Sequence, residues 1–366
     1  MIEQQTQMRR GTGLIALDRG RAFDGFTLFA PMFGDGTVYL IDLDGNIAHT
    51  WRLPYQPGDY GRLLPNGNLF YSAKTPDNDR RFLAWPLFKG GAVLEADWDG
   101  NILWEVRHPD HHHDARLTAA GTLLMLTLEK VPLEIAERVQ GGTHGPGGDV
   151  GMWADRLLEV TKQGEVLWEW HAYEHLDPET DRLTFNDWRD EWSHGNTILE
   201  TPEGHVLASF RNISTIGIID KASGQFIWKL GPPTLSQQHD PQVLPNGNVL
   251  VFDNGAYRPN VPQTFSRVIE IDTATNDVVW SYRDSPLYNF YSAYISGAQR
   301  LPNGNTLICE GCTGRLFEVT SAGEIVWEFI SPHFFNIPIV GANNWVFRAF
   351  RYSREDVHRW SRGRVG

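Results

Sequence analysis

The segments AQRLPNGNTLIC, residues 298 to 309, and GRLFEVTSAGEIVW, residues 314 to 327, together contain one complete structural repeat of the chain. The first segment is a hairpin around an Asn-Gly turn, whose glycine supplies the positive φ that a tight turn needs. The second alternates apolar and polar residues on both sides of a Ser-Ala-Gly turn, which is the pattern of a second hairpin. The repeat therefore predicts four short antiparallel strands that end at Trp327.

The same unit recurs along the chain, and each copy ends in a tryptophan. These residues are 47 to 64 positions apart: Trp51, Trp104, Trp168, Trp228, Trp280 and Trp327. A period of this size is typical of propellers and solenoids. Six units of four strands predict an all-β protein, a six-bladed β-propeller. We expect the six tryptophans to pack between blades, since large aromatic rings dominate core packing.

The two ends of the chain each contain part of one further blade. FTLFAP, residues 26 to 31, resembles a second strand without a first, and NNWVFRAFRYS, residues 343 to 353, resembles a first strand without the rest. Joining these N- and C-terminal strands would close the ring, so residues 1–366 are predicted to form a single domain. Long insertions at about 129–155 and 171–193 interrupt the repeat. Such loops are usually functional, and we expect these two to form a lid over the channel face.

Composition excludes several classes of partner. The 366 residues contain 32 Lys and Arg against 45 Asp and Glu, a net charge of −13, which disfavours nucleic acid and anionic membranes. The chain contains neither an apolar segment of signal-peptide length at its start nor one that could span a membrane, and we expect a cytoplasmic protein. Cys309 and Cys312 are expected to be small buried residues, with a local disulfide or redox pair as the alternative. The oligomeric state is left open.

Aligning the repeats on their first turn glycine brings polar residues to one height. His113 lies eight residues before Gly121, and His239 lies eight before Gly247. The same offset in three other repeats gives Asp59, Asn196 and Ser296, with His194 two residues before Asn196. Equal offsets mean equal heights on the innermost strands, so we expect these side chains to converge on the central channel. In the run of histidines that ends at His113, only one member is expected to point inward. His144 and His333 are left undecided.

Arginines in neighbouring strands predict an anion site. Arg211 follows the His194 strand by one hairpin, and Arg348 and Arg351 lie in the closing strand. An arginine that faces a channel or core is costly unless it binds an anion or forms an ion pair. On an acidic chain this pattern favours a small anionic substrate, and the alternative for Arg211 is an ion pair with Asp220 or Glu200.

Several of these motifs resemble one family. WSHGNTILE, LASFRNISTIGIID, WKLGPP and QQHDPQVLPNGNVLVFDNG are similar to segments of the arylsulfate sulfotransferases that use no nucleotide sulfate donor. The resemblance extends over roughly residues 25–355 and is most specific from 192 to 255. It implies a six-bladed propeller that transfers a sulfuryl group from a phenolic sulfate ester to a phenol through a sulfohistidine, without a cofactor.

The resemblance also implies roles for individual residues. The sulfurylated histidine falls on His239, the His-x-Asn pair on His194 and Asn196, the sulfate-binding arginine on Arg211, and a further channel histidine on His113. We expect His194 to shuttle protons, with Arg211, Asn196 and His113 as donors to the sulfuryl oxygens. Further substrate contacts are expected from Arg348 and from the lid rings Trp192 and Trp153.

Two other functions remain open from the sequence. The imidazoles of His113, His194 and His239, with Asp114 or Asp240 nearby, could hold a metal for hydrolysis, cleavage or oxygen chemistry, although a neighbouring arginine disfavours a dication. A non-enzymatic propeller that binds a partner or a quinone at its channel face is the third possibility.

Overall fold

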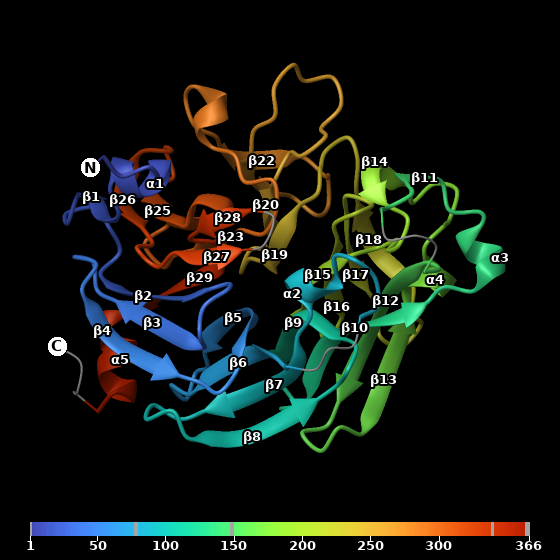
Figure 1. The fold of residues 1–366 in the computed structure, drawn as a ribbon, viewed down its shortest axis with the longest axis horizontal. Coiled ribbons are helices and arrows are strands. Elements are labelled where there is room, and N and C mark those ends of the chain that lie inside the picture. The colour runs from blue at the N-terminus through green and yellow to red at the C-terminus, as the bar shows by residue number, and fades with distance from the viewer. Residues whose placement is uncertain (1, 77–79, 147–149, 338–339, 363–366) are drawn as a thin grey trace.

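The repeats form a ring of antiparallel sheets. The computed structural model describes residues 2–76, 80–146, 150–337 and 340–362. Figure 1 looks onto this ring, with the six main sheets arranged around a common centre. The predicted six-bladed β-propeller is therefore confirmed.

In blades 1 to 5 the four main strands follow one another in chain order from the inside of the ring outward, whereas the innermost strand of blade 6 comes from the C-terminal segment. Blade 1 contains β5 (Gln56–Leu63), β6 (Leu69–Lys74), β7 (Gly91–Ala96) and β8 (Ile102–Arg107). Blade 2 contains β9 (His111–Leu117), β10 (Leu123–Lys130), β12 (Trp153–Val160) and β13 (Val166–His171). Blade 3 contains β15 (Gly195–Glu200), β16 (Val206–Phe210), β17 (Thr215–Ile219) and β18 (Phe226–Leu230).

The remaining three blades include both ends of the chain. Blade 4 contains β19 (His239–Val243), β20 (Val249–Asp253), β21 (Arg267–Ile271) and β22 (Val278–Tyr282). Blade 5 contains β23 (Gly297–Arg300), β24 (Thr306–Glu310), β25 (Arg315–Val319) and β26 (Ile325–Ile330), with β1 (Gly13–Leu17) at its outer edge. Blade 6 contains β29 (Val346–Ser353), β2 (Gly25–Pro31), β3 (Thr37–Ile41) and β4 (Ile47–Arg52).

The ring closes as the terminal segments predicted. The C-terminal strand β29 is the innermost strand of blade 6 and pairs with β2, with Leu28 opposite Phe350. The sequence did not predict β1, which extends blade 5 by pairing with β26 before the chain crosses to blade 6. The ends of the chain are therefore held in two neighbouring blades.

The repeated tryptophans link neighbouring blades. In five of the six repeats the indole N–H donates to a turn of the next blade, as Trp51 does to the Asp97 carbonyl at 3.1 Å and Trp327 to the Leu43 carbonyl at 2.9 Å. Trp104 instead donates within its own blade, to Glu95 at 2.5 Å. Trp104 still packs against a cluster built from blades 1 and 2, so the hydrogen bond between blades is made by five members and the predicted packing also holds for Trp104.

The insertions form small elements outside the blades. They contain α3 (Leu133–Ala136), β11 (Gly141–Thr143), α4 (Ala172–His175) and β14 (Leu183–Trp188), and β11 pairs with β14 (Figure 1). Residues 147–149 of the first insertion lie outside the described residues, and the lid remains a prediction. The other elements are α1 (Thr6–Arg10), α2 (Trp85–Phe88), η1 (Leu287–Asn289), η2 (Gly311–Thr313), β27 (Phe335–Ile337), β28 (Gly341–Asn343) and α5 (Arg354–Trp360). Within the described ranges, each helix is too short or too polar to cross a bilayer.

Candidate active site

The predicted channel histidines meet near the centre of the ring. The ring centroids of His113 and His194 lie 4.8 Å apart, nearly perpendicular to each other. The ring centroid of Phe347, in β29, lies 6.0 Å from that of His113 and 6.2 Å from that of His239. Blades 2, 3 and 4 therefore each contribute one imidazole to a single cluster.

A shared backbone irregularity presents these side chains. The innermost strands of blades 1 to 4 all break register with their neighbours close to the predicted height. Residues with positive φ occur there in five blades: Asp59 (123°), His113 (48°), His194 (53°), Asp240 (52°) and Ser296 (93°). A bulge re-aims a side chain, and positive φ in non-glycine residues is strained backbone typical of functional sites. Asp59, His113 and Ser296 occupy the aligned position itself, and His194 and Asp240 lie within two residues of it.

Burial keeps the three imidazoles neutral. It lowers the pKa of His113 and His239 well below the ordinary histidine value, and the charge of Arg211 contributes further at His239. The pKa of His194 falls to about 3, again mainly through burial and then through Arg211. A neutral imidazole has one N–H and one lone pair, so the hydrogen bonds at Nδ1 decide its chemistry.

The tautomer of His239 is fixed by Asn254. Nδ1 of His239 lies 2.8 Å from Oδ1 of Asn254, whose amide nitrogen donates to the carbonyls of Ser292 and Ile295. Because two carbonyls take up the amide N–H groups, the amide oxygen must face His239. Nδ1 of His239 therefore carries the proton, and Nε2 keeps the lone pair that a nucleophile needs.

The other two imidazoles are connected to acidic residues, His194 directly and His113 through His112. Nδ1 of His194 lies 2.5 Å from Oε2 of Glu191. Nδ1 of His113 lies 2.8 Å from Nδ1 of His112, whose Nε2 is 3.2 Å from Asp155 without the geometry of a hydrogen bond. His111, His112 and His113 are all buried, and of the three it is His113 whose ring meets His194.

Arg211 has one donor to spare. Its terminal nitrogens lie 3.3 Å from Asp187 and 2.6 Å from Oε1 of Gln237, and its guanidinium stacks on Tyr294. Nε of Arg211 is buried without a hydrogen-bond partner. The carboxylate partner of Arg211 is thus Asp187, from the second insertion. The two acids suggested by the sequence bond elsewhere, Asp220 to His205 and Glu200 to the Ala119 amide. The free N–H is suited to an anion.

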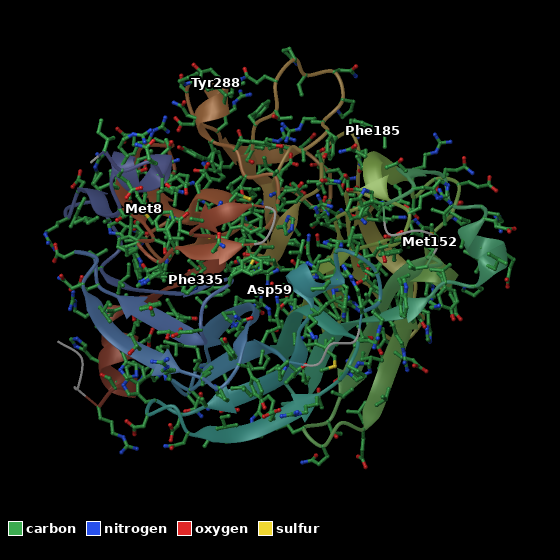
Figure 2. The ribbon with its side chains drawn as sticks, in the orientation of Figure 1. Met8, Asp59, Met152, Phe185, Tyr288 and Phe335 are labelled. Atoms are coloured by element: carbon green, nitrogen blue, oxygen red, sulfur yellow. The ribbon has the colours of Figure 1, made fainter. Side chains whose placement is uncertain are left out.

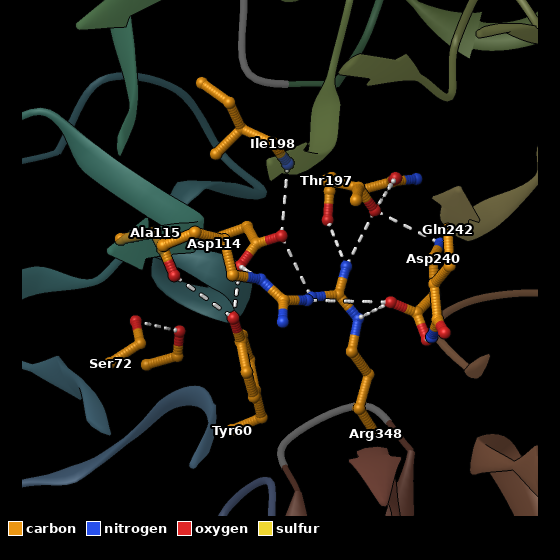
Figure 3. A network of polar contacts seen from close by, with 12 residues as sticks. Tyr60, Ser72, Asp114, Ala115, Thr197, Ile198, Asp240, Gln242 and Arg348 are labelled. Atoms are coloured by element: carbon orange, nitrogen blue, oxygen red, sulfur yellow. Dashed lines mark hydrogen bonds and ion pairs between the residues drawn. The ribbon is translucent and has the colours of Figure 1, made fainter. Parts of the chain in front are cut away.

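Arg348 lies in a buried network of charges, shown in Figure 3. Its guanidinium is 3.0 Å from Asp114 and 3.0 Å from Asp240, and it also donates to the Asn196 carbonyl and the Thr197 hydroxyl. Although burial opposes ionisation, Arg116 and Arg348 hold the pKa of Asp114 below its usual range. Arg348 is thus engaged with two carboxylates of the protein, and its predicted role as a substrate contact gains no support from this position.

Three other predicted contacts are engaged within the protein. The side-chain amide of Asn196 donates to the Gln238 carbonyl and accepts from Thr197. Trp192 is fully buried in an apolar cluster and donates to the Asp181 carbonyl, so its ring is part of the core. Trp153 is half-buried, with the charges of Arg81 and Lys130 over its ring. Substrate stacking on the two tryptophans gains no support from these positions.

Two phenylalanines flank the imidazole cluster. Phe88, the last residue of α2, stacks on His113 at 4.6 Å and meets the edge of His194 at 4.7 Å, and Phe347 flanks His113 and His239. The segment before Phe88 belongs to no repeat, so no sequence pattern pointed to it. Glu191 and Asp187 were missed because they lie in the irregular second insertion.

The remaining predicted groups lie elsewhere. His144 is exposed, and His333 stacks on Tyr39 at 3.9 Å. Cys309 and Cys312 are free thiols, the first of them buried. Among the residues that the structure describes, His, Cys, Asp and Glu form no group of three arranged to hold a metal ion.

Fold and site together define a propeller whose buried imidazoles and spare guanidinium N–H collect in its central channel. The chain matches the family model described as Arylsulfotransferase (ASST) over residues 87–332, and it belongs to this enzyme family. No curated protein sequence matches it.

Solved structures resemble this chain at low sequence identity. A protein of unknown function from Bacteroides caccae has a TM-score of 0.53 and 16% identity, covering 90% of this chain and 100% of that one. A streptogramin B lyase has a TM-score of 0.47 and 12% identity, with coverages of 88% and 83%. The catalytically inactive virginiamycin B lyase from Staphylococcus aureus with quinupristin has 0.42 and 13%, with coverages of 87% and 74%.

Proposed function

We propose that the protein transfers a sulfuryl group from an aryl sulfate ester to a phenol, with His239 carrying the group as a sulfohistidine. Family membership supports arylsulfotransferase-type activity on small aryl sulfates. The observation that carries the mechanism is the tautomer of His239, because Asn254 holds Nδ1–H and leaves the Nε2 lone pair close to the charge of Arg211.

The reaction divides into two displacements. Nε2 of His239 attacks sulfur as the donor's phenolate leaves, and the acceptor phenol then takes the group from Nε2. A phenolate is a good leaving group because phenol has a pKa of about 10. The spare Nε–H of Arg211 donates to a sulfuryl oxygen, where charge must be stabilised in both steps. His194 carries the proton between the two phenols.

A chromogenic aryl sulfate tests the reaction. We expect release of the coloured phenol to depend on an added phenol acceptor, since transfer needs one. Without acceptor, the protein should gain the mass of one sulfuryl group, mapped to His239 and labile in acid. Phenol-independent release with no label would indicate a hydrolase.

Matched variants test the nucleophile. His239→Asn should abolish both label and turnover while the melting temperature stays near that of the wild type. The control is His205→Asn, because His205 lies in the turn between β15 and β16 and pairs there with Asp220. A label that persists in the His239 variant would move the nucleophile to His113 or His194.

A further inference from the structure

The second insertion places one carboxyl group behind a channel histidine. Glu191 is only 4% exposed, and its Oε2 lies 2.5 Å from Nδ1 of His194. Its Oε1 is buried without a hydrogen-bond partner. A buried acid bonded only to an imidazole is able to exchange a proton with that ring.

The backbone of Glu191 is held firmly. Its carbonyl accepts from the side-chain amide of Asn212 at 3.0 Å, and the residue bridges to Trp153 of β12. The neighbouring amide of Trp192 donates to the Trp153 carbonyl at 2.8 Å. These contacts fix the carboxyl group relative to blades 2 and 3, so its approach to His194 is built into the fold.

The surroundings favour a neutral acid and a neutral imidazole. Burial raises the pKa of Glu191 well above its usual range, opposed by His112 and Arg211 and aided by Asp155 and Asp187. Those four groups, together with His113, also face His194. A neutral carboxyl group donates its O–H to Nδ1, which leaves the hydrogen of His194 on Nε2.

We propose that Glu191 is the proton store of the channel, exchanging one proton with Nδ1 of His194 each time Nε2 of His194 gives or takes one. This inference rests on the proposed function. In the first displacement the Nε2–H bond breaks and the phenol O–H bond forms, while the O–H of Glu191 breaks and Nδ1–H forms. The second displacement reverses each step as the acceptor phenol loses its proton.

The coupled transfer explains how a buried histidine works beside an arginine. An imidazolium at position 194 would be opposed by burial and by Arg211, which together lower the pKa of His194 to about 3. With Glu191 at Nδ1, the ring passes a proton while remaining neutral before and after each step. Glu191 acts through His194, and is therefore a positioning residue and proton store that does not contact substrate.

Glu191→Gln tests the store, because the amide keeps the shape and hydrogen bonding but cannot transfer a proton. We expect sulfuryl labelling from a 4-nitrophenyl ester, whose phenolate needs little assistance, to stay within about 10-fold of wild type. Labelling from a phenyl ester should fall by about 100-fold or more. KM should change little while kcat for phenyl donors falls, because Glu191 does not contact substrate. Equal losses for both donors, or none, would overturn the proposal.

Two companion variants separate chemistry from structure. Glu129→Gln removes a comparable acid that lies 2.8 Å from Nδ1 of His171, a pair outside the channel cluster, and should leave both donors unaffected. Glu191→Asp keeps an acid with shorter reach and should recover part of the phenyl-ester rate. A Glu191→Asp rate no higher than that of Glu191→Gln would contradict the role.

An independent measurement needs no turnover. In wild-type protein with 13C-labelled glutamate carboxyl groups, infrared spectra at neutral pH should show the C=O band of a protonated glutamic acid. This band should be absent in Glu191→Asp, because the aspartate carboxyl group is unlabelled. If every glutamate is ionised, the proton store is excluded. This reading holds even if Glu191→Gln fails to fold. Failure of the proposed function would appear separately, as a wild-type protein that neither transfers nor labels.

Discussion

At the scale of single residues, the spare donor of Arg211 gives a sharp prediction. Arg211→Lys keeps the charge but loses the planar fork that contacts Asp187 and Gln237 and leaves Nε–H free. We expect kcat/KM for an aryl sulfate to fall by about 100-fold, the usual effect of losing one transition-state donor. Steady-state kinetics with the chromogenic ester measures it.

A second buried arginine provides the control. Arg258 lies over Phe265 and bonds Asp253 at 2.8 Å, outside the histidine cluster, so Arg258→Lys should leave kcat/KM unchanged. If Arg211→Lys also retains the wild-type value, Arg211 serves only as the structural partner of Asp187.

Asp59 supplies a prediction about stability. It lies near the centre of the ring (Figure 2), fully buried, with both carboxylate oxygens lacking hydrogen-bond partners. Burial raises the pKa of this carboxyl group, although Lys74 and Arg348 oppose the rise and Asp114 adds to it. The folded protein therefore holds a proton that the unfolded chain loses above about pH 4. The stability that this proton contributes is present at low pH and declines as the pH rises.

Asp59→Asn removes that titration. We expect the variant to unfold at a higher urea concentration than wild type at pH 7, with the difference disappearing towards pH 4. Urea titrations at several pH values in this range would show it. A difference that does not vary with pH would mean that Asp59 is ionised in the folded protein.

At the scale of elements, β29 contributes the charge network as well as the closing strand. Arg348→Leu would leave Asp114 and Asp240 buried without this partner, and we expect a loss of about 3–5 kcal/mol in the free energy of unfolding. Arg354→Ala, which removes an exposed pair with Asp24 just beyond β29, should cost less than about 1 kcal/mol. If Arg348→Leu instead keeps wild-type stability but binds substrate more weakly, Arg348 contacts the substrate, as the sequence predicted.

The inner strands also show how far sequence could predict the site. Equivalent positions in repeated hairpins share one height, which is why offsets from turn glycines found His113 and His239 and placed His194 beside them. Glu191, Asp187 and Phe88 lie in segments without a repeat, where no periodicity fixes the direction of a side chain. Arg348 was assigned to the channel, but which ions pair in a buried network depends on contacts between blades.

At the scale of the whole molecule, closure was predictable because each end of the chain held the missing part of one blade. The fifth strand of blade 5 was not, since GLIAL lacks the turn and tryptophan that mark a repeat. Closure by β29 also brings Phe347 and Arg348 into the channel, so the strand that completes the ring completes the site. Stability and activity should therefore be lost together when the ring opens.

Deleting residues 343–366 tests this dependence. The truncated chain lacks the innermost strand of blade 6, which exposes β2 and leaves Asp114 without Arg348. Because open sheet edges and unpaired buried charges both destabilise, we expect loss of the cooperative melting transition seen for the full chain. Removing residues 1–12 is the control, since α1 buries no residue and that variant should melt as wild type does.

A permuted chain separates the loss of a strand from the loss of chain length. Placing residues 343–362 ahead of residue 13 through a flexible linker restores β29 and α5 in a new order, and Figure 1 shows β1 and α5 on the same side of the ring. We expect this permutant to recover both cooperative melting and transfer activity. The pairing of β29 with β2 depends on the two strands being present, and not on which of them comes first in the chain. A truncated protein that melts like the full chain would show that the propeller is held together without its closing strand.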